Sequence, residues 1–232
     1  MDIEEYSIIA PQYYNDNISS LLRKYLDCSN YNNILDCGCG DGSLLHALNK
    51  LNYLNNKKIF AIDLSKNRIK MVKEINPNIV AVIDNAEKLI SIKNNSIDFF
   101  ISTQVIEHVD DKRMIKQIKK KVRNGGIVYI STVFKKWYGW YFYRNKNKWV
   151  LDPTHIREYS SDKQLLNLFG KNKFKLLEQR KRLQWFPICD FFIKRIALKN
   201  RKLYEHIIMK IVRKIKLPIL GYYNWELVFR KI

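Results

Sequence analysis

Glycine occupies every second position from 38 to 42, directly after a short apolar run that contains Asp36 and Cys37. The run 34–37 predicts a buried strand, and a helical pattern begins at Leu44. Because glycine has no Cβ and accepts positive φ, a glycine turn between a strand and a helix lets the backbone approach a ligand closely. The first turn of the helix adds N–H groups that lack partners. The stretch therefore predicts a ligand site.

The glycine spacing differs from the Gly-x-Gly-x-x-Gly of dinucleotide-binding proteins, and Asp36 beside the turn suits a ligand with a positive group. Residues 33–43 resemble motif I of the class I S-adenosylmethionine (SAM)-dependent methyltransferases, whose cofactor carries an ammonium and a sulfonium group. The resemblance implies a Rossmann-like α/β fold of seven strands, mostly parallel with the last strand antiparallel, and helices on both faces. It also implies SAM as the cofactor.

Length and composition indicate one domain over residues 1–232. With 47% hydrophobic residues the chain can bury one core, and it has no apolar run of about 18 residues that would predict a transmembrane helix. Residues 1–5 are acidic where a secretory signal is basic, so we expect a cytoplasmic protein. The four cysteines show neither metal spacing nor a disulfide pattern. Residues 1–32 predict an N-terminal helical cap.

The positive charge is concentrated in the second half of the chain. Residues 1–100 hold 11 Lys/Arg and 12 Asp/Glu, whereas residues 101–232 hold 31 and 10, so that the net charge of +20 comes from the second part. One interpretation is a soluble surface in a lysine-rich chain. The other is an anionic partner, which could be a nucleic acid, a membrane surface or a phosphorylated substrate.

Strands and helices alternate from residue 33 to residue 103, which predicts a parallel sheet covered on both faces. The expected strands are 34–37, 58–62, 79–83 and 97–102, with helices over 44–54 and between Ser65, as N-cap, and Pro77. Asp36, Asp63 and Asp84 stand at the ends of the first three strands, and parallel strands end on one rim. Asp63 suits the two hydroxyls of a ribose, and Asp84 suits an adenine amino group. Three acids beside a glycine turn predict a nucleoside site.

We expect the cofactor to contact residues of the glycine turn and of the strand ends. These residues are Asp36, Gly38, Cys39, Gly40, Asp63, Leu64, Asp84, Asn85, Ala86, Thr103 and Gln104. In the resembled family a Tyr that precedes the domain's first helix often closes over the cofactor. The resemblance implies this role for Tyr14, with Tyr6 as the alternative.

Residues 96–132 resemble the methyltransferase segment with a Leu/Ile-Glu-His-Val turn after strand four and a Gly-Gly before strand five. The chain departs from the common pattern at Gln104 and Asn124. It lacks the Asp/Asn-Pro-Pro-aromatic turn of enzymes that methylate adenine or cytosine amino groups. It also lacks a cysteine after strand four or strand five, which argues against the RNA pyrimidine C5 methyltransferases, because those enzymes depend on such a cysteine. The remaining elements are expected at 110–122 (a helix ended by Asn124-Gly125-Gly126) and at 127–131, 174–182 and 222–231 (strands).

Two histidines are candidates for proton transfer. Residues 153–160 resemble the His-x-Arg-x-aromatic-Ser segment of small-molecule methyltransferases of the type 11 branch, and His155 within it is our preferred acid/base, because imidazole titrates near neutrality. A structural role for His155 remains open. His108 is either a packed polar residue of its turn or a general base. Glu107 and His108 could also join a metal site, as in some quinone-precursor O-methyltransferases, but two candidates are few and we assign no metal.

Two segments of the second half are rich in aromatic and basic residues. Residues 134–160 predict an aromatic loop that overhangs the acceptor site, or an aromatic lid packed on its own domain. Residues 184–220 predict a basic amphipathic insertion between the last two strands. The insertion suits an interfacial helix on an anionic membrane. The alternative is a pair of core-packed helices with a solvated basic face, or a dimer contact.

These features favour a SAM-dependent methyltransferase that acts on a hydroxyl, or less readily an amine, of a small-molecule, glycan or lipid-linked acceptor. Membrane association through 184–220 is a further possibility. One alternative is an RNA methyltransferase, which the charge and the aromatic residues permit. A second alternative is a non-catalytic protein of the same fold that serves as a partner subunit or membrane adaptor.

Overall fold

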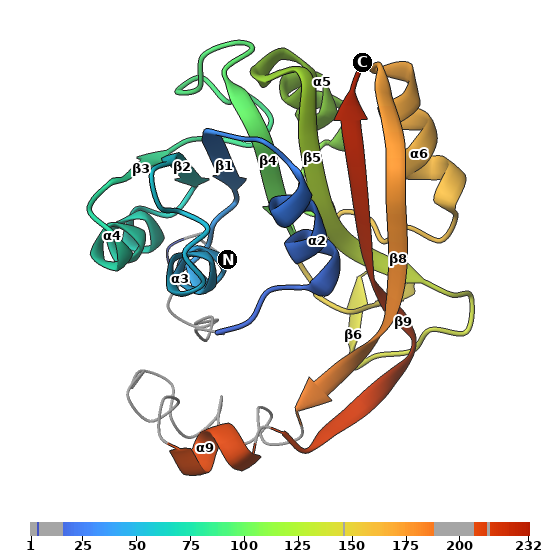
Figure 1. The fold of residues 1–232 in the computed structure, drawn as a ribbon. Coiled ribbons are helices and arrows are strands. Elements are labelled where there is room, and N and C mark those ends of the chain that lie inside the picture. The colour runs from blue at the N-terminus through green and yellow to red at the C-terminus, as the bar shows by residue number, and fades with distance from the viewer. Residues whose placement is uncertain (1–3, 5–15, 146, 188–206, 213) are drawn as a thin grey trace.

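The computed structural model describes residue 4 and residues 16–145, 147–187, 207–212 and 214–232 (Figure 1). The described strands are β1 (Asn33–Cys37), β2 (Lys58–Asp63), β3 (Ile79–Ile83), β4 (Ile97–Thr103), β5 (Val122–Lys135), β6 (Tyr143–Asn145), β7 (Lys148–Val150), β8 (Phe174–Pro187) and β9 (Lys216–Lys231). The described helices are α2 (Ser20–Cys28), α3 (Ser43–Lys50), α4 (Lys66–Ile75), α5 (Asp111–Lys121), α6 (Asp162–Lys171) and α9 (Ile207–Val212).

One seven-stranded sheet has the order β3-β2-β1-β4-β5-β9-β8. Strands β1 to β5 pair in parallel, and β9 lies antiparallel between β5 and β8. A small separate hairpin is formed by β6 and β7. This topology confirms the predicted Rossmann-like methyltransferase fold, with the last strand inserted antiparallel.

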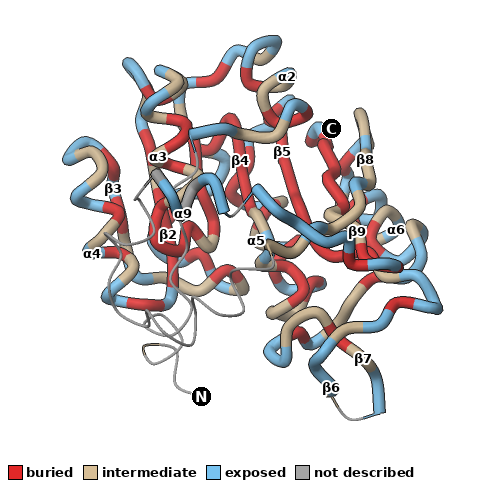
Figure 2. Tube along the Cα trace, turned by 90° about the horizontal axis from the view of Figure 1, so that it is seen from below, coloured by how far each residue is buried: buried red, intermediate tan, exposed pale blue. Residues whose placement is uncertain are grey.

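Successive residues of the central strands pack on opposite faces of the sheet. Ile34 and Phe99 face α2, α3 and α4, whereas their neighbours Leu35 and Phe100 face α5 and α6. All four side chains are fully buried, and each stabilises the fold by about 1.5–3 kcal/mol. Because the strands are apolar on both faces, helices must cover the sheet on both sides, as Figures 1 and 2 show.

One predicted helix end is wrong. The helix expected over 44–54 is α3, which ends at Lys50 and is followed by turns in which Asn52 and Asn56 have positive φ. The helix expected over 110–122 is α5, which ends at Lys121, and the next residue, Val122, pairs with Ile97 of β4.

The predicted insertion over 184–220 is too long. Strand β8 continues to Pro187 and β9 begins at Lys216, so Trp185 pairs with Pro218 in a ladder that extends beyond the rest of the sheet. The helix α9 belongs to the remaining part, of which residues 188–206 and 213 lie outside the described residues. None of the described helices has the length and hydrophobicity that a bilayer crossing requires.

Candidate functional site

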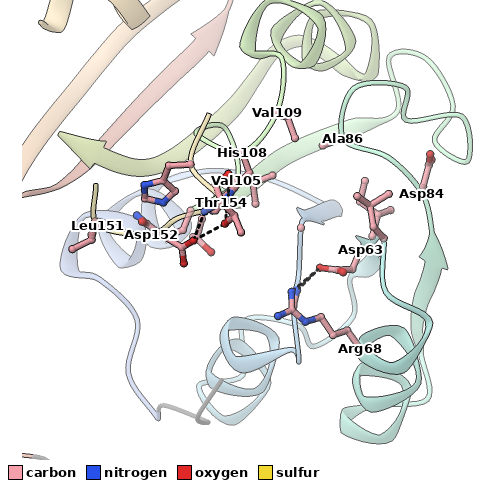
Figure 3. Close-up of a pocket in the computed structure, with 17 residues that line it drawn as sticks. Asp63, Arg68, Asp84, Ala86, Val105, His108, Val109, Leu151, Asp152 and Thr154 are labelled. Carbon is pink, nitrogen blue, oxygen red and sulfur yellow. Dashed lines mark hydrogen bonds and ion pairs between the residues drawn. The ribbon is translucent and has the colours of Figure 1, made fainter. Parts of the chain in front are cut away.

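A cavity of about 520 Å³ opens at the carboxyl ends of the parallel strands (Figure 3). Its volume lies within the range of small-molecule sites, about 300–1,000 Å³. The cavity is lined by Gly38, Gly40, Ile62, Asp63, Leu64, Arg68, Asp84, Ala86, Thr103, Gln104, Val105, His108, Val109, Leu151, Asp152, Thr154 and His155. It therefore joins the glycine turn to the turn after β4 and to the segment that follows β7.

The glycine turn wraps against the end of β2. The N–H groups of Gly38 and Cys39 donate to the carbonyl of Ile62 at 2.8 and 2.9 Å. Gly38 has φ of +76°, and a Cβ on it would lie 2.3 Å from Cγ2 of Val105. Only glycine fits this position, because both the backbone conformation and the space exclude a side chain.

Asp63 is buried and fixes the turn. Its carboxylate accepts hydrogen bonds from the N–H groups of Gly40 at 3.0 Å and Ser65 at 2.9 Å. The guanidinium of Arg68 reaches toward the same carboxylate, with Nη1 at 3.9 Å from Oδ2 (Figure 3). A carboxylate has about four lone-pair directions, so Asp63 retains capacity for the hydroxyls of a ligand in the cavity.

Asp36 lies behind the glycine turn and does not line the cavity. Its carboxyl group is buried, and neither oxygen accepts a hydrogen bond from the described residues. Burial, and then the charge of Asp63, raises the pKa of Asp36 to about 7. A buried acid without a partner next to a glycine cradle fits a ligand that brings a positive group, because such a group would stabilise the carboxylate.

Asp84 lines the cavity, but its carboxylate is engaged by its own loop. It accepts from the backbone N–H of Ser91 at 2.8 Å, from the Ser91 hydroxyl at 2.6 Å and from the N–H of Asn85 at 2.7 Å. Burial alone would raise the pKa of Asp84, and these hydrogen bonds outweigh it and lower the pKa. Figure 3 shows Asp84 on the side of the cavity formed by the end of β3.

Most of the predicted cofactor residues line the cavity. Those that do are Gly38, Gly40, Asp63, Leu64, Asp84, Ala86, Thr103 and Gln104. Asp36, Cys39 and Asn85 do not, since Cys39 is buried and the Asn85 side chain accepts from the N–H of Glu87. Tyr14 and Tyr6 lie outside the described residues.

Arg68, Leu151, Asp152 and Thr154 also line the cavity, and the sequence motifs did not indicate them. Arg68 stands in the first turn of α4, where a cation is unfavourable against the helix dipole. Its guanidinium also lies 3.4 Å from the buried carboxylate of Asp41. A cation in the first turn of a helix next to two acids is a signal that could have indicated Arg68.

His108 and His155 meet on the opposite side of the cavity from Asp63. Their ring centroids are 4.7 Å apart. Nδ1 of His155 lies 2.9 Å from Oε1 of Glu158, and Nδ1 of His108 lies 3.0 Å from the hydroxyl of Thr154. Burial, and then His155, lowers the pKa of His108. His108 and His155, which the sequence indicated as separate candidates, therefore lie on the same wall of the cavity.

Glu107 completes a cluster that could hold a metal ion. One potential ligand atom each from Glu107, His108 and His155 lies within 4.8 Å of the others. Glu107 is fully buried, Thr132 donates to its Oε2 at 2.9 Å, and its Oε1 has no partner among the described residues. Burial raises the pKa of Glu107 to about 7. Two imidazoles and a carboxylate are a donor set that suits zinc or another divalent ion.

Comparisons with known proteins agree with this geometry. A family profile described as "Methyltransferase domain" matches residues 7–179. The mitochondrial ubiquinone biosynthesis O-methyltransferase of Saccharomyces cerevisiae is 25% identical over 190 residues, which cover 75% of this chain. The chain spans 60% of the length of that relative.

Two solved structures share the fold. A putative methyltransferase from Bacillus halodurans superposes with a TM-score of 0.63 at 17% identity, and the match covers 92% of this chain and 99% of the other. The [4+2]-cyclase SpnF superposes with a TM-score of 0.63 at 17% identity and covers 98% of this chain and 94% of its own. The architecture alone therefore does not fix the reaction, and the residues of the cavity must indicate it.

Proposed function

This chain belongs to the class I SAM-dependent methyltransferases, and we propose that it transfers the methyl group of SAM to a hydroxyl of a small-molecule, glycan or lipid-linked acceptor. One observation supports the proposal more than any other. A single cavity is lined on one side by Gly38, Gly40 and Asp63 and on the other by His108 and His155. The first side suits a nucleoside with a positive group, and the second suits the removal of a proton.

The cofactor side is built from fixed backbone and a buried acid. Asp63, held by Gly40 and Ser65, is oriented to accept the hydroxyls of a ribose. Gly38 and Gly40 leave room for close approach, and Asp36 behind them would be ionised by a neighbouring positive charge. These residues fit SAM, which supplies a methyl group already activated by the positive charge on its sulfur.

The acceptor side of the cavity takes up the proton that the acceptor hydroxyl loses. In the proposed reaction the acceptor oxygen forms a bond to the methyl carbon as the carbon–sulfur bond breaks, and the hydroxyl proton passes to Nε2 of His155. The contact between His155 Nδ1 and Glu158 orients the ring for this transfer. Positioning of the reactants in the cavity contributes most of the rate. The name of the yeast relative, an O-methyltransferase, supports a hydroxyl as the acceptor.

The position of Glu107 favours a second role for the wall formed by His108 and His155, namely binding of a metal ion. With His108 and His155 it would hold a divalent cation, which would lower the pKa of an acceptor hydroxyl. The two uses differ in one test. If His155 acts as a base, protein treated with a chelator keeps its activity, whereas a cation site loses activity and regains it when zinc or magnesium is returned.

The experiment measures transfer of a labelled methyl group from SAM by the full chain. The acceptors are a panel of phenols and catechols, a lipid extract and total RNA. We expect the labelled methyl group in a hydroxyl compound or in the lipid fraction. Label in RNA would support the alternative of an RNA methyltransferase. SAM binding without transfer to any acceptor fraction would support the non-catalytic alternative.

A further inference from the structure

Two exposed apolar segments lie outside the cavity. The first, here the aromatic arm, comprises residues 137–143 between β5 and β6, and its exposed side chains are Trp137, Tyr138, Trp140, Phe142 and Tyr143. The second, here the hairpin tip, is the outer end of the β8–β9 ladder, and its exposed side chains are Trp185, Ile215, Leu217 and Leu220. Trp137 is 93% exposed and Leu220 is 68% exposed. Apolar side chains at this density are unusual on a surface that meets only water.

The aromatic arm contacts the inner end of the hairpin tip, and the two together are here called the docking face. The N–H of Lys136 donates to the carbonyl of Gly221 at 2.7 Å, at the inner end of the hairpin tip. The backbones of Gly139 and Gly221 are so close that a Cβ on Gly221 would lie 2.5 Å from Cα of Gly139. Tyr141 of the arm also packs against Phe186 of β8, with ring centroids 6.4 Å apart. Figure 1 shows the ladder extending beyond the rest of the sheet.

The exposed rings of the aromatic arm contact one another and Trp149, whereas Tyr141 packs against the buried Tyr222. Trp140 lies 5.1 Å from Phe142 and 5.8 Å from Trp149, and Trp137 lies 5.4 Å from Tyr138, between ring centroids. These contacts fix the rings while leaving much of their area in solvent. A rigid set of tryptophan and tyrosine rings loses little entropy on docking, and such residues favour the boundary between lipid and water.

The charged side chains that the structure describes on this face are basic. Residues 134–151 contain four lysines and one arginine and no Asp or Glu, and residues 207–220 contain three lysines and one arginine, again without an acid. Lys136, Arg144 and Lys148 are exposed beside the aromatic arm, and Lys214 and Lys216 are exposed beside the hairpin tip. A cationic rim around an apolar centre is complementary to an anionic bilayer, in which lipid phosphates meet the lysines and acyl chains meet the apolar residues.

We propose that this face docks the protein on an anionic lipid bilayer. The aliphatic side chains of Ile215, Leu217 and Leu220 favour lipid over RNA, because they neither stack on bases nor form hydrogen bonds to them. Docking also orients the cavity. Leu151 packs against the cluster of Val133, Ile219 and Tyr222 beneath the face and lines the cavity on its acceptor side. An acceptor held in the bilayer, if the proposed methyl transfer is correct, would enter beside Leu151.

The test is co-sedimentation of the full chain with vesicles, without SAM or acceptor. Vesicles of phosphatidylcholine are compared with vesicles that also contain phosphatidylglycerol. We expect binding to the second kind only, weakened at high salt. The double variant Trp137→Ser, Trp140→Ser is expected to bind at least about tenfold more weakly. Lys136→Gln is expected to reduce binding about fivefold, because a lysine near the surface contributes about that factor.

Ile90→Ser is the control, since Ile90 is 77% exposed on the loop after β3 and its loss removes exposed apolar surface elsewhere. It should bind vesicles as the wild type does. The variant Asp63→Asn should also bind normally, so a failure of the methyl-transfer proposal leaves this one intact. Each variant's thermal midpoint shows that it is folded. The proposal is overturned if the wild type ignores anionic vesicles, if Ile90→Ser weakens binding as much as the tryptophan variant, or if the face binds RNA or a second copy of the chain instead.

Discussion

His108 and His155 lie edge to face with their ring centroids 4.7 Å apart, although one follows β4 and the other follows β7. Backbone hydrogen bonds hold them together. The N–H groups of Ile156 and Arg157 donate to the carbonyl of Glu107 at 2.9 and 3.2 Å. The acceptor wall of the cavity is therefore a joint between two segments, and it forms only when the chain has folded.

The first prediction concerns His155. Replacement by Gln keeps a polar side chain of similar length but removes the proton acceptor, so kcat should fall by about 10²–10⁴ while the affinity for SAM is unchanged. Steady-state kinetics and calorimetry measure the two quantities. His46→Gln, on α3 outside the cavity lining, is the control and should leave kcat as it is. A His155→Gln variant with wild-type kcat would remove His155 from the mechanism.

The second prediction concerns Asp36 and pH. Because its pKa is raised from 3.8 to about 7 in the folded protein, the folded state retains a proton that the unfolded chain has lost between these values. The free energy of unfolding therefore falls as pH rises from about 4 to about 7, and the loss is complete above that range. Asp36→Asn removes this cost and should be more stable than the wild type by roughly 2–4 kcal/mol at about pH 8.

Urea unfolding at about pH 5 and pH 8 checks this prediction. The stability difference between Asp36→Asn and the wild type should be larger at the higher pH, and the variant should bind SAM more weakly, because it lacks the ionisable acid. A difference in stability that does not change with pH would mean that Asp36 is ionised in the folded protein.

The third prediction compares two glycines. Gly38→Ala places a Cβ 2.3 Å from Val105 at positive φ and should lower stability by about 1–3 kcal/mol and impair SAM binding. Gly170, within α6, has open space around its Cα. Gly170→Ala should raise stability by about 0.5–1 kcal/mol. Thermal unfolding of both variants measures the shifts, and equal midpoints would contradict the strain assigned to Gly38.

The sequence predicted the features that depend on local pattern. The strand Ile79–Ile83 and the Ser65 cap of α4 are found as expected, since apolar periodicity and capping chemistry act within a few residues. Asp36 and Asp63 were placed at strand ends for the same reason. That the two acids interact follows from the parallel register of β1 and β2, which the alternation of strands and helices implied.

Features that depend on contacts between distant segments could not be predicted from local sequence patterns. The packing of His108 against His155, the pairing of Arg68 with Asp41 and Asp63, and the engagement of Asp84 by Ser91 are set by tertiary folding. The sequence of the outer part of the β8–β9 ladder predicted an amphipathic insertion. Its exposed apolar residues do not alternate with polar ones, and such alternation is the pattern that predicts a strand with one buried face.

Binding of SAM to the full chain, followed by isothermal titration calorimetry, tests the central claim most directly. The account predicts one site per chain with micromolar affinity. Asp63→Asn should bind about 10- to 100-fold more weakly, because hydrogen bonds to a charged acceptor contribute about 1.5–3 kcal/mol. Asp162→Asn, which alters a carboxylate paired with Lys181 outside the cavity lining, should bind as the wild type does. No binding of SAM by the wild type, or equal affinity in Asp63→Asn, would contradict the account.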